Sequence, residues 1–402
     1  LLAELGLEGE IEWVETRTGF YSNGQLYSMS NSIEFLRFPP LTLWERVRLG
    51  ASIFYASKIK NWRRLERVPV AQWLRRWAGQ GAFEKIWRPL LAAKLGDTYK
   101  KTSAAFIWAH INRMYKARRS GMKREMFGYV PGGYARIIDR LSDVRIYENV
   151  AIRCDAAVSR VHSHPHGAVD VEFQSGQRES FDRVVFTVPA GLISNCCPQL
   201  SPDERTRFQG VDYLGIVCAS LLLKKRLSAF YVTNITDPWV PLTAVIEMTN
   251  VVRPDHLDGH HLVYLPKYVP ADSPLFEMAD KELESNWLAA LEKMHPQFSR
   301  DDVLAFRISR ARHVMALPTL RYSEKLPPQQ TSIPGVYAVN SAHILKGNLN
   351  VNETIQVAEA ALDSVLRHEL DGTMDADAQQ DDLKRTANQH DETSRQLVGR
   401  PG

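Results

Sequence analysis

The chain has 402 residues, 44% of them hydrophobic, and a formal net charge of +4 at pH 7. A chain of this size buries a sizeable core and is predicted to form about two domains. The nearest candidate for a membrane span, Leu214 to Leu223, is far shorter than the ~20 residues such a helix needs. Its four cysteines form no Cys-x-x-Cys pair, so the sequence predicts neither a metal site nor a disulfide framework and fits a reducing compartment.

The first third of the chain is predicted to be mainly helical. It begins with a hairpin over residues 11–29, because Asn23-Gly24 favours a tight primed turn between alternating apolar residues. Thr42 and Glu45 then form a capping box that opens a helix reaching about Ile59. Further helices are predicted at Val70 to Trp77, Ala82 to Lys94, Ser103 to Arg118 and, after a Pro-Gly-Gly turn, Tyr134 to Leu141.

The helical block over residues 42–120 holds most of the positive charge. Between Lys58 and Arg124 there are 18 Lys and Arg residues against three acidic ones, a net charge of +15 that leaves −11 for the rest of the chain. Tryptophans interleave with these charges, which suits an anionic membrane surface or a polyanionic ligand. A solvated basic face over a Trp-rich core is favoured for most of the charges, because long basic side chains commonly cover apolar surface. Nucleic acid ranks last, since no nucleic-acid-binding module is recognisable.

From Arg145 onward the hydrophobic period becomes that of strands. Strands are predicted at Arg145 to Tyr147, Ile152 to His162, Val169 to Phe173, Phe181 to Val188, Val217 to Leu223, Phe230 to Ile235, Leu242 to Met248, Leu262 to Tyr268 and Val303 to Met315. Ser201 and Glu204 form a second capping box, and a helix is predicted from about Leu275 to Met294. The polar composition after Leu370 predicts that residues 371–402 are disordered.

The segment from Val336 to Leu362 predicts a binding loop between a buried strand and a helix. Val336 to Val339 is too apolar for a half-exposed strand, and Asn352 is placed to cap a helix with Ile355, Ala358 and Leu362 on its apolar side. Unpaired amides and the positive end of the helix dipole attract an electron-rich or anionic group. Ligands of doubly wound folds sit at the carboxyl ends of strands, so this loop is a candidate site.

Four segments together resemble the FAD-dependent amine oxidase superfamily, which includes protoporphyrinogen oxidases, phytoene desaturases and UDP-galactopyranose mutases. They are the Pro131-Gly132-Gly133 turn before a helix, the strand-hairpin-strand stretch from Ala157 to Pro189, the stretch from Ala316 to Tyr322, and the strand-loop-helix from Gly335 to Leu362. The resemblance implies an α/β fold in which a doubly wound, Rossmann-like FAD-binding domain is interleaved with an α+β substrate domain. Residues 125–209 and 316–370 would form the FAD-binding domain, and residues 1–124 and 210–315 the substrate domain.

The superfamily's Gly-x-Gly-x-x-Gly turn, which lets the backbone approach the FAD pyrophosphate, has no counterpart in this sequence. The nearest match, Gly79 to Glu84, has Glu in place of the third glycine and lies between two predicted helices. The chain also begins at Leu1 within a helical pattern. We therefore expect the sequence to lack the N-terminal dinucleotide-binding βαβ unit and, as given, to bind FAD poorly.

The resemblance implies cofactor-binding roles for eight residues. The backbone of Val158 would pair with the edge of the FAD adenine. Asn340 and Ser341 stand where many relatives have Gly-Asp or Gly-Glu, and both can hydrogen-bond a ribityl hydroxyl although a charge is lost. Amides of the first helical turn would approach the flavin pyrimidine, at Val351, Asn352, Glu353, Thr354 and Ile355. The alternative for these five is an ordinary capped helix.

No catalytic side chain and no metal ligand is predicted. In flavin oxidations the cofactor takes the hydride, so little side-chain signature remains. His110 and Arg113 on a helix, and Arg310 and Arg312 on a strand, could face substrate carboxylates or phosphates, but a structural role is favoured for each. The histidines near position 164 have no acids or cysteines at ligand spacing.

The leading interpretation is an FAD-dependent oxidoreductase resembling protoporphyrinogen oxidases, in which the flavin accepts a hydride from a small organic substrate. One alternative is an enzyme resembling UDP-galactopyranose mutases, for which arginines on a diphosphate are expected. Another is a non-catalytic, flavin-free module that binds a membrane surface or a partner. The expected location is cytoplasmic, with peripheral association at the inner membrane through the basic block.

Overall fold

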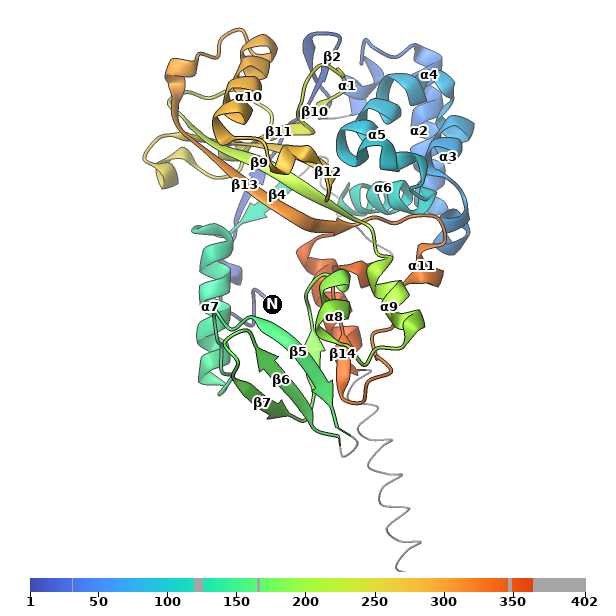
Figure 1. The fold of residues 1–402 in the computed structure, drawn as a ribbon. Coiled ribbons are helices and arrows are strands. Elements are labelled where there is room, and N and C mark those ends of the chain that lie inside the picture. Colours follow the sequence, from blue (N-terminus) through green and yellow to red (C-terminus); the bar gives the residue numbers. More distant parts are fainter. Residues whose placement is uncertain (31, 119–125, 165–166, 346–348, 364–402) are drawn as a thin grey trace, which may run out of the picture.

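The structure, a computed structural model, describes residues 1–30, 32–118, 126–164, 167–345 and 349–363. These residues form two bodies, one above the other in Figure 1. The upper body contains a seven-stranded sheet and a block of helices, and the lower body contains smaller sheets and the helices beside them. The fold is therefore of the mixed α/β class. The predicted disordered tail, residues 371–402, lies outside the described residues.

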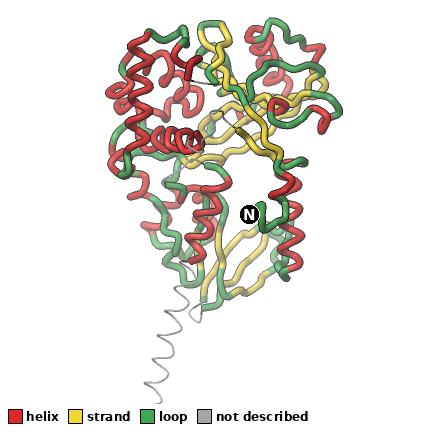
Figure 2. Tube along the Cα trace, turned by 180° about the vertical axis from the view of Figure 1, so that it is seen from behind, coloured by secondary structure: helices red, strands yellow, loops and turns green. Residues whose placement is uncertain are grey.

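The large sheet has the order β13-β9-β12-β11-β10-β2-β3, and its neighbours are antiparallel except for the parallel pair β10 and β2. Its strands are β2 (Thr18–Ser22), β3 (Gln25–Ser28), β9 (Tyr213–Leu223), β10 (Val232–Ile235), β11 (Ala244–Glu247), β12 (His261–Pro270) and β13 (Val303–Ala316). One face packs on α10 (Asp280–Met294) through residues such as Trp287 and Leu291, and the other faces the helical block (Figure 2). The apolar run over residues 214–223 is thus a central strand.

The predicted hairpin exists but is shorter than expected. Asn23 and Gly24 have φ of 54° and 74°, the left-handed values that a type I′ turn requires, and both amides donate to the Asp237 carboxylate. The hairpin strands are only β2 and β3. Residues Glu12–Glu15 form a separate strand, β1, which pairs antiparallel with β4 (Met126–Tyr129) where the two bodies meet.

The helical block contains α1 (Ser32–Leu36), α2 (Leu43–Lys58), α3 (Val70–Ala78), α4 (Gln80–Ala82), α5 (Arg88–Leu95) and α6 (Ala104–Arg118). The capping box of α2 is confirmed, because Glu45 N donates to Thr42 Oγ1 at 3.3 Å and Thr42 N donates to the Glu45 carboxylate at 2.8 Å. A π-helical turn over Phe83–Trp87 interrupts the helix predicted from residue 82. Side chains of Trp62, Trp73 and Trp108 are buried in the core of the block.

The lower body combines a three-stranded antiparallel sheet with a two-stranded parallel one. Its elements are β5 (Val158–Ser163), β6 (Val169–Phe173), β7 (Arg178–Phe181), β8 (Val184–Phe186), β14 (Val336–Ala338), α7 (Gly133–Tyr147), α8 (Ala190–Cys196), α9 (Pro202–Gln209) and α11 (Tyr322–Lys325). The parallel pair is β8 with β14. The predicted capping box of α9 is present, and the Glu204 carboxylate also accepts from Ser201 Oγ at 2.8 Å.

The strand predicted at Arg145 to Tyr147 is wrong, because α7 continues through these residues. Asn149 adopts φ of 63°, the left-handed conformation that ends many helices, and Val150 N donates to the Arg145 carbonyl at 2.9 Å. Ile146 and Tyr147 favour strands, but with Arg145 they complete a helical turn that Asn149 terminates. The next strand, β5, begins only at Val158.

Candidate active site

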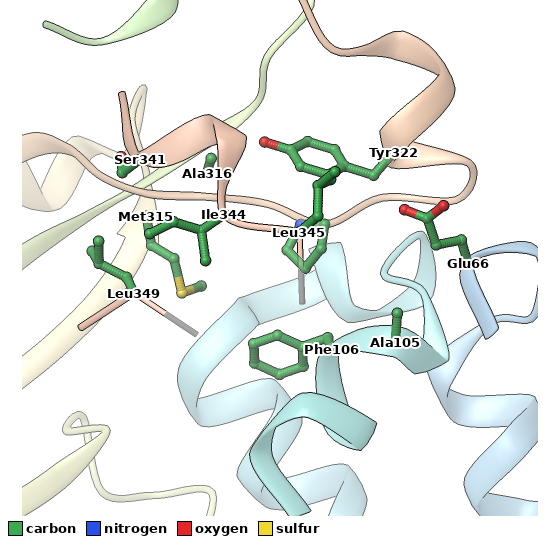
Figure 3. Close-up of a pocket in the computed structure, with 11 residues that line it drawn as sticks. Glu66, Ala105, Phe106, Met315, Ala316, Tyr322, Ser341, Ile344, Leu345 and Leu349 are labelled. Carbon is green, nitrogen blue, oxygen red and sulfur yellow. The ribbon is translucent and has the colours of Figure 1, made fainter. Parts of the chain in front are cut away.

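The pocket nearest the predicted binding loop lies between the two bodies, where the end of β13, the loop after β14 and the first turn of α6 come together (Figure 3). Its lining is mainly apolar, with polar atoms from Glu66, Tyr322 and Ser341. The lining residues are Glu66, Ala105, Phe106, Met315, Ala316, Pro318, Tyr322, Ser341, Ile344, Leu345 and Leu349. The space that they enclose is about 30 Å³.

Asn340 fixes the start of this loop. Val339 N donates to the Phe186 carbonyl at 2.8 Å, which brings the carboxyl ends of β14 and β8 side by side. Asn340 is 8% exposed; its Nδ2 donates to the Val188 carbonyl at 2.9 Å, and its Oδ1 accepts from Ala342 N at 3.0 Å. The side chain therefore ties one strand end to the other, and one N–H of the amide remains for a ligand, because Oδ1 also accepts from the backbone of the capping-box residue His343.

His343 supports the same turn through hydrogen bonds to Pro327 and Asn340. Its Nε2 donates to the Pro327 carbonyl at 3.2 Å, so the neutral ring presents Nδ1 as the acceptor for Asn340 N at 3.2 Å. Burial lowers the pKa of His343, although the two backbone contacts oppose the shift. The ring is consequently neutral at pH 7 and acts as a rigid support.

Two buried polar side chains connect the pocket to the helical block. Tyr322 OH donates to the Ala342 carbonyl at 2.9 Å, and burial, assisted by the charges of Tyr213 and Glu66, strongly raises the pKa of Tyr322. Glu66 is 5% exposed and accepts from Ser323 N at 3.0 Å and from Ser323 Oγ in a short hydrogen bond. In Figure 3 the two side chains lie on the same side of the pocket. Both are committed to holding the bodies together.

A partly buried cation lies next to the pocket. The ammonium group of Lys94 lies 6.0 Å from the ring centre of Phe106, which lines the pocket, and 5.5 Å from that of Tyr268. Burial, followed by the charge of Arg113, lowers the pKa of Lys94 to about 8. Among the described residues no carboxylate pairs with it. Lys94 is therefore a charge that finds no counter-ion in the described part of the chain, beside an apolar pocket.

Of the predicted cofactor-binding residues, the structure places Ser341 in the pocket and Asn340 directly before it. Val158 begins β5 in the lower sheet, where its carbonyl accepts from Cys196 Sγ at 3.8 Å. A hollow of about 420 Å³ precedes it, lined by residues 153–157, 173–175 and 177. Neither Val158 nor Val351 to Ile355 lines the pocket; Leu349 is the lining residue nearest the last helix in sequence.

The cap predicted at Asn352 is wrong, because the last helix, residues 351–363, begins two residues earlier. Asn350 Oδ1 accepts from Glu353 N at 3.1 Å, and its carbonyl accepts from Thr354 N at 3.0 Å. Asn352 lies within the first turn. The buried side also differs from the predicted one, because Ala361 is buried whereas Ala358 and Leu362 are exposed. The sequence Asn350-Val-Asn352 offers two caps, and only the path of the incoming loop selects between them.

Replacement of Asn350 by Ala is therefore expected to destabilise the last helix by about 1 kcal/mol, the usual value for an N-cap, whereas Asn352→Ala should be nearly neutral. Thermal unfolding of the two variants measures the difference. If Asn352→Ala is instead the less stable variant, Asn352 is the N-cap residue.

Several charged residues that could have faced a substrate have structural partners instead. Arg310 donates to the Met278 carbonyl and to Asp280 at 2.7 and 2.6 Å, and Arg312 donates to the Ala271 carbonyl at 2.8 Å. His164 contacts Asp170 at 2.7 Å. The described residues contain no group of three His, Cys, Asp or Glu placed to hold a metal ion. Within the same residues no helix is long and apolar enough to cross a membrane.

Comparison with known proteins decides the family. Residues 1–355 match the family of flavin containing amine oxidoreductases. The chain belongs to this family. Its cofactor is accordingly FAD, and the protein is an FAD-dependent oxidoreductase. No curated protein matches the sequence.

Solved structures share the fold of this amine oxidoreductase at low sequence identity. A protein named as a protoporphyrinogen oxidase from Exiguobacterium sp. 255-15 is 16% identical, with a TM-score of 0.66 over 90% of this chain and 84% of that one. A putrescine oxidase triple mutant is 16% identical, with a TM-score of 0.66 over 91% and 84%. A reduced UDP-galactopyranose mutase is 13% identical, with a TM-score of 0.65 over 89% and 79%.

The residues of the pocket fit FAD in their chemistry. Apolar side chains of Phe106, Met315 and Leu345 suit a flat aromatic ring, the Ser341 hydroxyl makes no hydrogen bond to any described residue, and Asn340 keeps free hydrogen-bonding capacity. The enclosed 30 Å³ holds about one or two water molecules. The lining residues therefore match a flavin in their chemistry, whereas the enclosed volume is much smaller than the cofactor.

Sequence reasoning missed Glu66, Phe106 and Met315, which come from three separate segments. The one available signal was Glu66, a rare acidic residue in a strongly basic stretch.

Proposed function

We propose that this amine oxidoreductase resembles protoporphyrinogen oxidases in its reaction and oxidises a small organic substrate that carries carboxylates. The proposal assigns the lower body and the loop after β14 to an FAD-binding domain and the upper body to a substrate domain. The observation that carries it is Lys94, a partly buried cation whose ammonium group lies 6.0 Å from the ring centre of the pocket-lining Phe106 and has no carboxylate partner among the described residues.

A buried charge without a partner costs free energy, and an anionic group of a substrate would offset that cost. The same charge disfavours a cationic amine. The pocket's one acidic lining residue, Glu66, does not reverse this preference, because both of its carboxylate oxygens already accept hydrogen bonds from Ser323. The charges around the pocket thus support a carboxylated substrate over an amine such as putrescine.

A mutase-like reaction on a nucleotide sugar has less support. Arginine binds diphosphates well because its planar group donates two parallel hydrogen bonds. Among the described residues that line the pocket there is no arginine.

When bound, FAD would supply the hydride acceptor, and the chain's own residues would place the substrate against it. Ser341 and the free N–H of the Asn340 amide would hold the polar part of the cofactor, and the amides of Val351 and Asn352 at the helix N-terminus would face its pyrimidine. Val158 would hold the adenine through its backbone. The apolar lining would exclude water, and Lys94 would orient the substrate carboxylate.

The test compares substrates on protein supplied with excess FAD. Protoporphyrinogen, putrescine and UDP-galactopyranose are offered in turn, with oxygen consumption and sugar transfer as readouts. We expect oxidation of the porphyrinogen, and Lys94→Met should raise its KM by roughly tenfold to 100-fold, the loss of one charge-assisted contact. Because Lys94 loses its proton as the pH rises through about 8, the wild-type KM should also rise above that pH.

Lys267 provides the matched control. It is another partly buried lysine with a pKa lowered by burial, and the alternation of β12 places it on the opposite face of the sheet from Tyr268. Lys267→Met should leave the KM unchanged. Equal effects of both variants, or faster turnover of putrescine, would contradict the proposed substrate class.

A further inference from the structure

Helix α2 has an apolar face that is largely exposed. Trp44 is 71% exposed, Leu43 67%, Phe54 55% and Val47 50%, and Ala51 is exposed between them. These positions follow the spacing of one helix face, and the buried residues Leu49, Ser52 and Ala56 lie on the opposite face. The solvent-facing side of a surface helix normally carries polar residues, whereas this side of α2 is apolar.

The exposed apolar side chains run along most of the length of α2. Over 16 residues α2 extends about 24 Å, and the exposed apolar side chains run from its first residue to Tyr55 near its end. Ile33 and Leu36, 63% and 50% exposed, belong to α1, the helix that packs on α2. In Figure 1 α2 lies on the outer side of the helical block, away from the large sheet. We refer to these side chains of α1 and α2 as the α2 stripe.

The charges around the α2 stripe are free cations. Lys58, Lys60, Arg63 and Arg64 follow its C-terminal end, all exposed, and none forms an ion pair with a described residue. Lys58 covers Phe54, with its ammonium group 5.1 Å from the ring centre. The surface therefore combines exposed apolar side chains with unpaired positive charge.

The acidic residues of the same stretch offset these cations only in part. Glu34 accepts from Ser28 Oγ at 2.6 Å and from Ser30 N at 2.7 Å. Glu45 pairs with Lys85 at 2.8 Å, and Glu66 is buried against Ser323. Glu34 keeps its negative charge because its serine partners are neutral, so the α2 stripe meets its partner with an excess of positive charge.

We propose that the α2 stripe is a membrane-docking surface, on which α2 lies in the plane of an anionic bilayer with Trp44 and Phe54 among the headgroups. Charge complementarity selects this partner. A helix with aromatic and aliphatic residues on one face and flanking Lys and Arg binds anionic lipid by apolar burial and electrostatic attraction together. A second copy of the chain would place the same cations against each other across a two-fold axis, which is unfavourable.

Vesicle partition and depth-dependent quenching test the proposal on the full chain. The protein should bind vesicles of phosphatidylglycerol and phosphatidylcholine, and brominated lipids should quench its tryptophan fluorescence. Trp44→Gln with Phe54→Gln should weaken partition by at least roughly tenfold, given the apolar area withdrawn. Lys60→Gln, Arg63→Gln and Arg64→Gln together should weaken binding to anionic vesicles and reduce its salt dependence.

Trp13 supplies the control, since it is 62% exposed on β1, away from the helical block. Trp13→Gln should keep partition and quenching unchanged. Oxidation of a soluble substrate without vesicles should be equal in all variants, so a failure of the proposed reaction is separable from a failure of docking. Unchanged partition of the Trp44 and Phe54 variant would overturn the proposal. So would a vesicle-free dimer that the same variant abolishes, because the stripe would then serve self-association.

Discussion

Replacement of Asn340 by Ala is expected to lower the free energy of unfolding by about 2 kcal/mol and to weaken FAD binding. The change removes the acceptor of Ala342 N, a cap contribution of about 1 kcal/mol, and leaves the Val188 carbonyl without its donor, which costs about as much again. Because the same amide fixes the ends of β8 and β14, the loss also loosens the loop that carries Ser341. Urea unfolding and titration with FAD measure the two effects.

Ser341→Ala is the matched control, because its hydroxyl bonds to no described residue. It should weaken FAD binding and leave the unfolding free energy unchanged. If Asn340→Ala destabilises the protein while FAD binds as before, Asn340 is a structural residue only.

Acidification from pH 7 to pH 4 is expected to destabilise the upper body by about 3 kcal/mol through His295 alone. This residue is 1% exposed at the end of α10, and burial lowers its pKa from 6.5 to about 4. The folded state therefore binds the proton less readily than the unfolded state, so stability is complete above pH 6.5 and falls as the pH drops toward 4. The magnitude follows from about 1.4 kcal/mol per unit of pKa difference.

The measurement is thermal or urea unfolding of the wild type and of His295→Gln across this pH range. On acidification the variant should lose about 3 kcal/mol less stability than the wild type, which is the contribution of His295. His343 contributes a slope of the same sign, because its pKa is also lowered, and it should persist in the variant. Parallel pH profiles for the two proteins would show that His295 does not titrate in this range.

The parts of the fold that could be read from the sequence are those set by neighbours along the chain. The Asn23-Gly24 turn and the capping boxes at Thr42 and Ser201 depend on a few adjacent residues, and all three form as expected. Errors occurred where two local solutions compete. At Arg145 to Tyr147 and at Asn350 against Asn352, both readings satisfy local preferences, and the surrounding chain selects one.

The sequence by itself determined the family resemblance, many of the strands and helices, the loop after β14 and the concentration of positive charge before residue 124. It could not determine the pocket, because Glu66, Phe106, Met315 and Ser341 come from segments that meet only when the two bodies pack. Nor could it separate the α2 stripe from a buried helix face. Leu43, Trp44, Val47 and Phe54 read as core residues by hydrophobicity, and only the packing of α2 through its other face, at Leu49 and Ala56, leaves them facing outward. Burial is a property of the assembled surfaces, so the tertiary structure alone decides which apolar residues stabilise the core and which remain free to contact a partner.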